Sequence, residues 1–386
     1  MRVLVVDPPL FTLPYDLELC RALGQAGSHV ELVGRPLRDY EVGSEKGVTL
    51  RPLFYRMTDR GGDAWRTSPL TKILKGLEHG AGLLALDRLV ARLRPDVVHF
   101  QWLVLPLLDR LLLRRLTRGT RLILTVHNSS LGAHSAKVVA GGVAAAAQQV
   151  GRRDLVDLFH GFIAHTEQTR AQLEAVGVAR RRIRVLAHPP LSVGDLPHAT
   201  SDGTVRILFF GSIKPYKGVD VLARAALDLL PSRPRCRIDV VGRPFETLEA
   251  ERQAIAAAGL EKRFGFDLRY VPDDDLARYL AAADIVVFPY REIDASGAFA
   301  LAVTAGKPIV ASALGVFAER PASEHIRLVP PGDSSALAAA LASLVDDPDA
   351  RERLGEQVRA LRGASVSWST FAAECVAFYG DRLPAR

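Results

Sequence analysis

The stretch "ILFFGSIKPYKGVD", from Ile207 to Asp220, decides how this part of the chain folds. Its first four residues are apolar and predict a buried strand, Gly211 ends that strand, and a helical pattern begins at Lys217 or Gly218. A strand that passes through a glycine turn into a helix gathers backbone N–H groups and a helix N-terminus in one place, where an anion binds. Lys214 and Lys217 add positive charge there; the alternative is two solvated lysines on an exposed loop.

The same alternation of short apolar runs and longer helical patterns continues on both sides of this stretch. Runs such as "RVLVVD", "DVVHFQ" and "RLILTVH" precede it, and "RIDVVG", "DIVVFP" and "PIVAS" follow it. Between the halves, "HPPLSVGDLPHATSDG" (188–203) has the Pro, Gly and Ser content of a linker. We therefore predict an α/β protein of two tandem doubly wound, Rossmann-like domains that face each other across a cleft, with ligands at the carboxyl ends of the strands.

The composition limits the kinds of partner that the chain binds. Of its 386 residues, 48% are apolar and 24% are charged, and the net charge of +7 favours anionic partners. The basic residues are dispersed and no nucleic-acid module is recognisable, which argues against nucleic acid as a partner. Because Cys20, Cys236 and Cys375 lack metal or redox spacing, and neither a leader nor a membrane-spanning pattern is visible, we expect a cytoplasmic protein.

Six further stretches, together with the opening one, resemble the retaining glycosyltransferases of the GT-B fold, in particular family 4, also called group 1. They occur in the family's order over most of the chain: "PDVVHFQW", "LTVHN", "DLFHGFIAHTEQ", "YVPDDDLARYLAAADIVVFPY", "SGAFALAVTAGKPIVAS" and "SWSTFAAECVAFY". The resemblance implies an acceptor-binding domain over residues 1–190, a hinge over 191–203 and a donor-binding domain over 204–366. It also implies that a last helix, at 367–386, crosses back onto the first domain.

The activity that the resemblance implies is transfer of a sugar from a nucleotide-diphosphate donor to a hydroxyl acceptor, with retention of the anomeric configuration. The acceptor is a lipid-linked saccharide, a polysaccharide or a small molecule, as in polysaccharide, glycolipid or natural-product synthesis. No metal or other cofactor is implied, because lysines and helix N-termini neutralise the diphosphate. A phosphorylase or epimerase on the same fold, and a non-catalytic nucleotide-sugar or membrane-surface binding protein, remain alternatives.

By the same resemblance, the loop after the first strand of the second domain holds the donor's diphosphate. Lys217 has the main role, and Lys214 stands where relatives often have arginine, with Gly211 and Ser212 in the turn beside them. Arg243, after the next strand, is either a further diphosphate contact or a solvated loop residue.

A pair of glutamates that the family carries in its donor loop is missing from this chain. Counted back from the "GKP" element, the two positions fall on Ile293 and Leu301, which are apolar. The nearest carboxylates that can accept hydrogen bonds from sugar hydroxyls are Glu292 and Asp294, and we expect Asp294 to take part in the reaction. The alternative for Asp294 is a helix-capping role.

Two predicted helix starts complete the donor site. Ser296 is expected to cap a helix whose first residues, Gly297 and Ala298, let a phosphate approach the backbone; the alternative is that Ser296 only caps the helix. Val271 is expected to contact the base through its backbone, whereas Asp273 is interpreted as a helix N-cap rather than a ligand.

In the first domain, His127 ends a strand, and the resemblance places it beside the transferred sugar. A neutral imidazole there can form a hydrogen bond with a sugar hydroxyl or stabilise the charge that develops as the glycosidic bond breaks. The alternative is a packed strand-end histidine bonded to backbone. His99, which lies within "VVHFQ", is interpreted as a structural residue. By the same resemblance, acceptors usually contact the first loop. The predicted acceptor contacts are Pro8, Phe11, Tyr15 and Asn128.

The segment from Leu70 to Arg94 mixes leucines with basic residues and predicts a basic amphipathic helix. Such a helix can lie on an anionic membrane, where a lipid-linked acceptor is found. The open alternative is an ordinary surface helix with a solvated basic face, so peripheral contact with the inner face of the membrane is a hypothesis.

Overall fold

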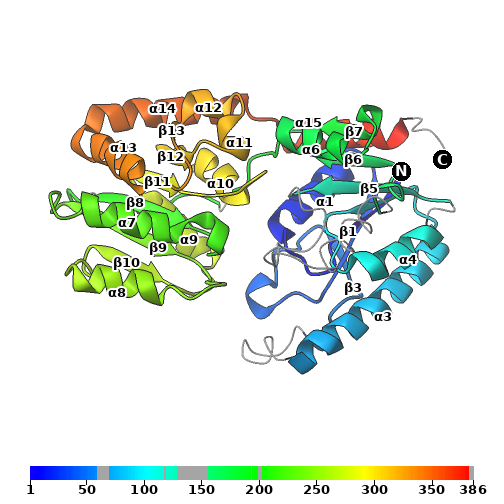
Figure 1. The fold of residues 1–386 in the computed structure, drawn as a ribbon. Coiled ribbons are helices and arrows are strands. Elements are labelled where there is room, and N and C mark those ends of the chain that lie inside the picture. The colour runs from blue at the N-terminus through cyan, green and yellow to red at the C-terminus, as the bar shows by residue number, and fades with distance from the viewer. Residues whose placement is uncertain (59–68, 117–118, 128–154, 193, 199–201, 382–386) are drawn as a thin grey trace. The chain divides into compact units, whose positions relative to one another are not determined.

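The chain divides into two compact units in a computed structural model (Figure 1). One unit joins Met1–Ala187 to Ser367–Arg386, and the other is His188–Val366, so the expected hinge at 191–203 belongs with the second unit. The structure describes residues 1–58, 69–116, 119–127, 155–192, 194–198 and 202–381.

The first unit is built on a parallel sheet with the strand order β3-β2-β1-β4-β5-β6-β7. Its strands are β1 (Arg2–Val6), β2 (His29–Gly34), β3 (Thr49–Pro52), β4 (Val97–Phe100), β5 (Arg121–Val126), β6 (Gly161–Ala164) and β7 (Ile183–Val185). Its helices are α1 (Leu13–Gln25), η1 (Asp39–Glu41), α3 (Pro69–Leu93), α4 (Pro106–Leu116), α6 (Glu167–Ala175), η2 (Arg180–Arg182) and α15 (Trp368–Gly380). Strands β4 and β6 are buried throughout, because helices cover both faces of such a sheet.

The second unit repeats this plan, with the strand order β10-β9-β8-β11-β12-β13, all parallel. Its strands are β8 (Val205–Phe210), β9 (Cys236–Val241), β10 (Phe264–Asp267), β11 (Ile285–Phe288), β12 (Ile309–Ser312) and β13 (Arg327–Val329). Its helices are η3 (Pro215–Lys217), α7 (Val219–Leu229), α8 (Glu249–Ala257), α9 (Asp273–Ala282), α10 (Gly297–Ala305), α11 (Gly315–Ala318), α12 (Ala322–His325), α13 (Ser334–Asp346) and α14 (Pro348–Ala364).

The strand order reverses once in each sheet, and the reversal fixes where ligands bind. In the second unit the chain leaves β8 towards β9 and β10 and then returns to place β11 on the other side of β8. In the first unit β1 lies in the same way between β2 and β4. Ligands of open α/β sheets bind at such switch points, outside the carboxyl ends of the strands.

The last helix, α15, packs on the first unit, as predicted. Ser367 caps α15 by accepting a hydrogen bond of 3.1 Å from the N–H of Thr370. At the other end, the Tyr379 hydroxyl and the His99 Nδ1 are 2.7 Å apart, and His99 Nε2 lies 2.7 Å from the Thr125 hydroxyl. Burial lowers the pKa of His99 to about 3, so it is a neutral packing residue, as its interpretation from sequence required.

Two helix starts differ from the predictions. Helix α7 begins at Val219, one or two residues later than expected, because the single turn η3 intervenes and Gly218 turns the chain in the left-handed region. The interpretation of Asp273 as an N-cap is wrong: Pro272 occupies that position and Asp273 is the first helical residue of α9.

Candidate functional site

The loops that follow β8 and β9 form one ledge at the carboxyl edge of the second sheet. Ile213 N–H donates to the carbonyl of Arg243 at 2.8 Å, and Phe245 N–H donates to the carbonyl of Ile213 at 2.8 Å. A Cβ on Gly242 would overlap the carbonyl of Gly211, so only glycine allows this approach. The exposed Ser212 lies in the turn of the same ledge.

Lys217 is a buried cation beside this ledge. Its side chain is 8% exposed, and its Nζ lies 3.3 Å from the position that a Cβ would take on Gly211. Among the described residues Lys217 Nζ has neither an ion pair nor a hydrogen bond, and burial lowers its pKa. A buried ammonium without a counter-ion is costly, unless a ligand supplies the negative charge.

The first turn of α10 reaches the same place. Ser296 caps the helix, as predicted, because its Oγ accepts a hydrogen bond of 3.2 Å from the N–H of Phe299. The Ala298 Cβ lies 3.7 Å from the position of a Cβ on Gly211. Gly297 and Ala298 belong to the first turn of α10, whose N–H groups an α-helix leaves without intrahelical partners, and this turn lies beside the glycine turn. The structure thus brings together the Gly211 turn, the Lys217 ammonium and a helix N-terminus, the parts of an anion site.

Two further cations lie on the ledge around one aromatic ring. Lys214 Nζ and Arg243 Cζ are each 5.5 Å from the ring centroid of Phe245, which is 58% exposed. Burial, together with the neighbouring Lys217, lowers the pKa of Lys214 to about 7. Phe245 was not among the predicted site residues, although an aromatic residue two positions after Arg243 is a visible signal in the sequence.

The carboxylates expected to replace the missing glutamates lie in different surroundings. Asp294 is 5% exposed and its carbonyl accepts a hydrogen bond of 3.1 Å from Val316 N–H, whereas Glu292 is exposed. The alternative role of Asp294 as the helix cap is wrong, because Ser296 is the N-cap of α10. Val271 is half-buried and packs against the core of the second unit.

His127 belongs to an aromatic cluster at the carboxyl ends of the first sheet. Its Nε2 lies 3.0 Å from the Gln101 Oε1, and its ring stacks on Trp102 with centroids 5.3 Å apart. Its other aromatic neighbours are Tyr15 and His165. The half-buried imidazole is thus fixed, at the end of β5, by a side-chain amide and an indole.

The prediction that Tyr15 offers apolar surface to an acceptor is wrong, and Pro8, also predicted as an acceptor contact, is covered as well. Tyr15 is 2% exposed, because Trp368 of α15 packs against it with centroids 5.2 Å apart, and Pro8 is buried. Phe11 is 46% exposed and contacts Trp102 edge-on, which leaves it able to meet a ligand. Asn128 lies outside the described residues.

A buried pair of carboxyl groups after β1 was also not predicted from the sequence. Asp7 and Asp16 are both fully buried, and Thr12 Oγ1 lies within hydrogen-bond distance of each. Burial raises the pKa of Asp7 to about 6 and that of Asp16 as well. Thr12 also accepts a hydrogen bond of 3.0 Å from the Trp102 indole. Through Thr12, the two carboxyl groups are therefore linked to the aromatic cluster.

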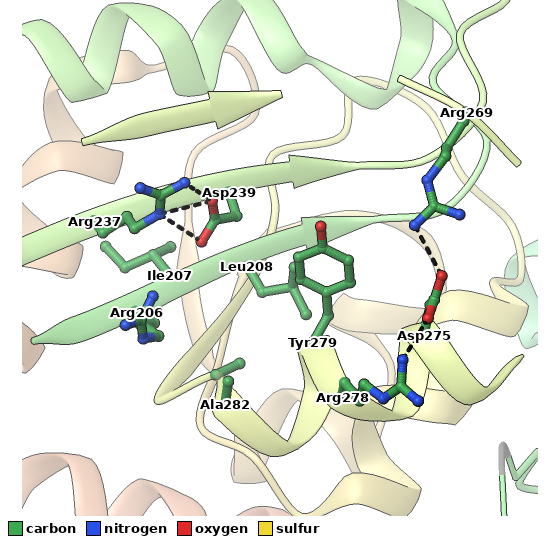
Figure 2. Close-up of a pocket in the computed structure, with 11 residues that line it drawn as sticks. Arg206, Ile207, Leu208, Arg237, Asp239, Arg269, Asp275, Arg278, Tyr279 and Ala282 are labelled. Carbon is green, nitrogen blue, oxygen red and sulfur yellow. Dashed lines mark hydrogen bonds and ion pairs between the residues drawn. The ribbon is translucent and has the colours of Figure 1, made fainter. Parts of the chain in front are cut away.

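A cavity of about 420 Å³ lies elsewhere in the second unit, between α9 and the sheet (Figure 2). Its arginines are already paired: Arg237 with Asp239 at 2.8 Å, and both Arg269 and Arg278 with Asp275 at 2.8 Å. Paired guanidinium groups attract an incoming anion less than an unpaired buried ammonium does. The candidate site is therefore the one at Lys217.

Two observations concern metals and membranes. Within the described residues, no cluster of three or more His, Cys, Asp or Glu side chains is placed to hold a metal ion. Over the same part of the chain, no helix combines the length and the apolar character that crossing a bilayer requires.

Comparison with known families gives a match for each half of the chain. Residues 15–189 match the family model described as Glycosyltransferase Family 4, and residues 204–347 match the one described as Glycosyl transferases group 1. The first match includes most of the first sheet, and the second includes Gly211, Lys217 and the start of α10.

Two relatives match parts of the chain. A GDP-mannose:glycolipid 4-beta-D-mannosyltransferase of Xanthomonas campestris pv. campestris is 36% identical over 106 residues, which are 28% of this chain and 30% of the relative. A D-inositol 3-phosphate glycosyltransferase of Corynebacterium glutamicum is 32% identical over 184 residues, 46% of this chain and 43% of the relative. The chain thus spans less than half the length of either. Sucrose-phosphate synthase from Thermosynechococcus elongatus shares the fold, with a TM-score of 0.74, 19% identity and 98% of both chains covered.

Proposed function

Because the chain belongs to the group 1, family 4-like glycosyltransferases and has their two-domain GT-B fold, we propose that it transfers a sugar from a nucleotide-diphosphate donor to a hydroxyl acceptor. The observation that carries the proposal is the burial of the Lys217 ammonium beside the Gly211 turn and the N-terminus of α10, with no counter-ion among the residues that the structure describes. A diphosphate supplies the missing negative charge, and it is the leaving group of a nucleotide sugar.

In this reaction the bond from the anomeric carbon to the diphosphate oxygen breaks, and the acceptor oxygen forms the new bond. Negative charge grows on the diphosphate as that bond breaks, and Lys217, Lys214 and the N–H groups of α10 stabilise it. The acceptor proton passes to the leaving phosphate oxygen, so the proposed route needs no separate general base. In this scheme His127 bonds a hydroxyl of the transferred sugar, and Asp294 accepts hydrogen bonds from others.

The proposed stereochemical outcome is retention at the anomeric carbon. It rests on the family resemblance, and the name of the Xanthomonas relative, which records a 4-beta linkage, gives a reason to test it. The anomeric coupling constants of donor and product, measured by NMR, decide between retention and inversion.

The acceptor that we propose is lipid-linked. The Xanthomonas relative is named for a glycolipid, and α3 of this chain exposes three large apolar side chains at helical spacing on one face: Ile73, Leu77 and Leu84. Arg88 and Arg92 are exposed further along the same helix. An apolar stripe with adjacent basic groups suits an anionic membrane surface, to which a cytoplasmic enzyme binds peripherally.

A thermal-shift panel of nucleotides and nucleotide sugars tests the proposal. A ligand that binds only the folded chain raises its stability by mass action, so a hit names the donor. Absence of any shift over all common nucleoside diphosphates would overturn the proposal. Nucleotide binding without turnover over a wide acceptor panel would indicate a non-catalytic protein, and phosphate-dependent turnover without nucleotide would indicate a phosphorylase.

A further inference from the structure

Tyr290, directly beneath Lys217, is a residue that the proposed reaction does not use. It follows β11, is fully buried, and its ring centroid lies 5.1 Å from Lys217 Nζ. A buried ammonium usually faces a carboxylate, but none pairs with Lys217 in the described part of the chain. The π face of Tyr290 is therefore a partner that offsets part of the hydration that this cation loses.

Backbone contacts on either side of both residues fix this pair. Before Tyr290, the carbonyl of Pro289 lies so close to Gly218 that a Cβ there would overlap it. After Tyr290, the N–H of Arg291 donates to the carbonyl of Tyr216 at 2.7 Å. The neighbours of Tyr290 in sequence thus contact the neighbours of Lys217 in sequence. The ring and the ammonium are held together by the chain itself and not by their own attraction alone.

The Tyr290 ring is also held from its other sides and stays neutral. It packs against Phe288 at 5.5 Å, Phe317 at 5.6 Å and Tyr216 at 6.2 Å between centroids. Burial raises the pKa of its phenol, against the lowering effect of the Ser296 hydroxyl. A neutral ring stabilises a cation without neutralising it, whereas a carboxylate in its place would compete with an incoming phosphate.

We propose that Tyr290 is a positioning residue for Lys217, whose π face keeps the ammonium oriented and free of a counter-ion until a diphosphate arrives. This proposal rests on the proposed function, because it assigns a ligand to Lys217. It explains why Lys217 is buried with no carboxylate partner in the described part of the chain: its first strong anionic partner is the ligand. It also gives the aromatic residue that ends the "VVFPY" stretch a role beyond core packing.

The test is the affinity for inorganic pyrophosphate, measured by calorimetry in a set of folded variants. Tyr290→Leu, with Tyr290→Met as a second variant if the first does not fold, should bind about tenfold more weakly, because the π face is lost. Tyr290→Phe should stay within about twofold, because a phenyl ring keeps that face. Phe264→Leu is the matched control: Phe264 is a buried aromatic residue of β10 whose loss weakens the same core without touching Lys217.

A double-mutant cycle with Lys217→Met separates this proposal from the proposed function. The effect of Tyr290→Leu should disappear in the Lys217→Met background, since no ammonium is left to position. Wild-type affinity in Tyr290→Leu, equal losses in Tyr290→Leu and Phe264→Leu, or an undiminished effect in the Lys217→Met background would each overturn the positioning role. If wild type and Lys217→Met bound pyrophosphate equally, Lys217 would not be a diphosphate ligand. That result would refute the proposed function itself, whatever the effect of Tyr290→Leu.

Discussion

Replacing Lys217 with methionine should weaken diphosphate binding and, at the same time, should not destabilise the fold. Methionine keeps most of the aliphatic volume, so the change removes the charge from a side chain that is only 8% exposed. A charge-assisted hydrogen bond is worth about 1.5–3 kcal/mol, which corresponds to roughly a 10- to 150-fold loss of affinity. The upper part of this range is expected, because Lys217 Nζ has no other anionic partner among the described residues.

The stability of the ligand-free protein should move in the opposite direction. An ammonium buried without a counter-ion costs free energy that the cation–π contact with Tyr290 only partly offsets. Lys217→Met removes that cost, so the melting temperature should stay level or rise while affinity falls. If Lys217 only packed the loop, its replacement would lower both the melting temperature and the diphosphate affinity.

Calorimetric titration with the best diphosphate, together with a melting curve without ligand, measures the two effects. Lys307→Met is the matched control, since Lys307 is a half-buried lysine of the same unit whose Nζ donates to the carbonyl of Ala281 at 2.9 Å. It makes the same change in net charge away from the site and should leave affinity unchanged. Wild-type affinity in a folded Lys217→Met variant would refute the reasoning, and so would equal losses in both variants.

Three further outcomes are expected. Diphosphate affinity should fall as the pH rises through about 7, where Lys214 loses its proton, and Lys214→Met should remove that step; titrations between pH 6 and 8.5 check it. Asp294→Asn should reduce transfer from the whole nucleotide sugar but spare affinity for the bare diphosphate, and a variant with wild-type kinetics would rule out the sugar contact. The protein should sediment with anionic vesicles at low salt and dissociate at high salt. Leu77→Ser should weaken this binding whereas Tyr270→Ser in the other unit should not, and equal binding by both would remove the role of α3.

The sequence by itself predicted the features that depend on a few neighbouring residues. Continuous apolar runs predicted the parallel sheets, because a strand buried on both faces needs apolar side chains on both. The glycine after β8 predicted the turn, and Ser296 and Ser367 predicted two helix caps, each formed with an N–H three residues further on. The resemblance then indicated Lys217 as the central residue of the site, and its burial is consistent with that.

Only the tertiary structure decided which side chains lie beside one another and which are covered. Tyr290 reaches Lys217 because strand order places β11 next to β8, a pairing that no local pattern records. Tyr15 lies next to the first loop, and its position in the sequence predicts an exposed side chain. In the structure α15, which comes from the far end of the chain, covers it. Burial and pKa values depend on all the groups around a side chain, and long-range packing brings those groups together; local sequence rules extend over only about one helical turn.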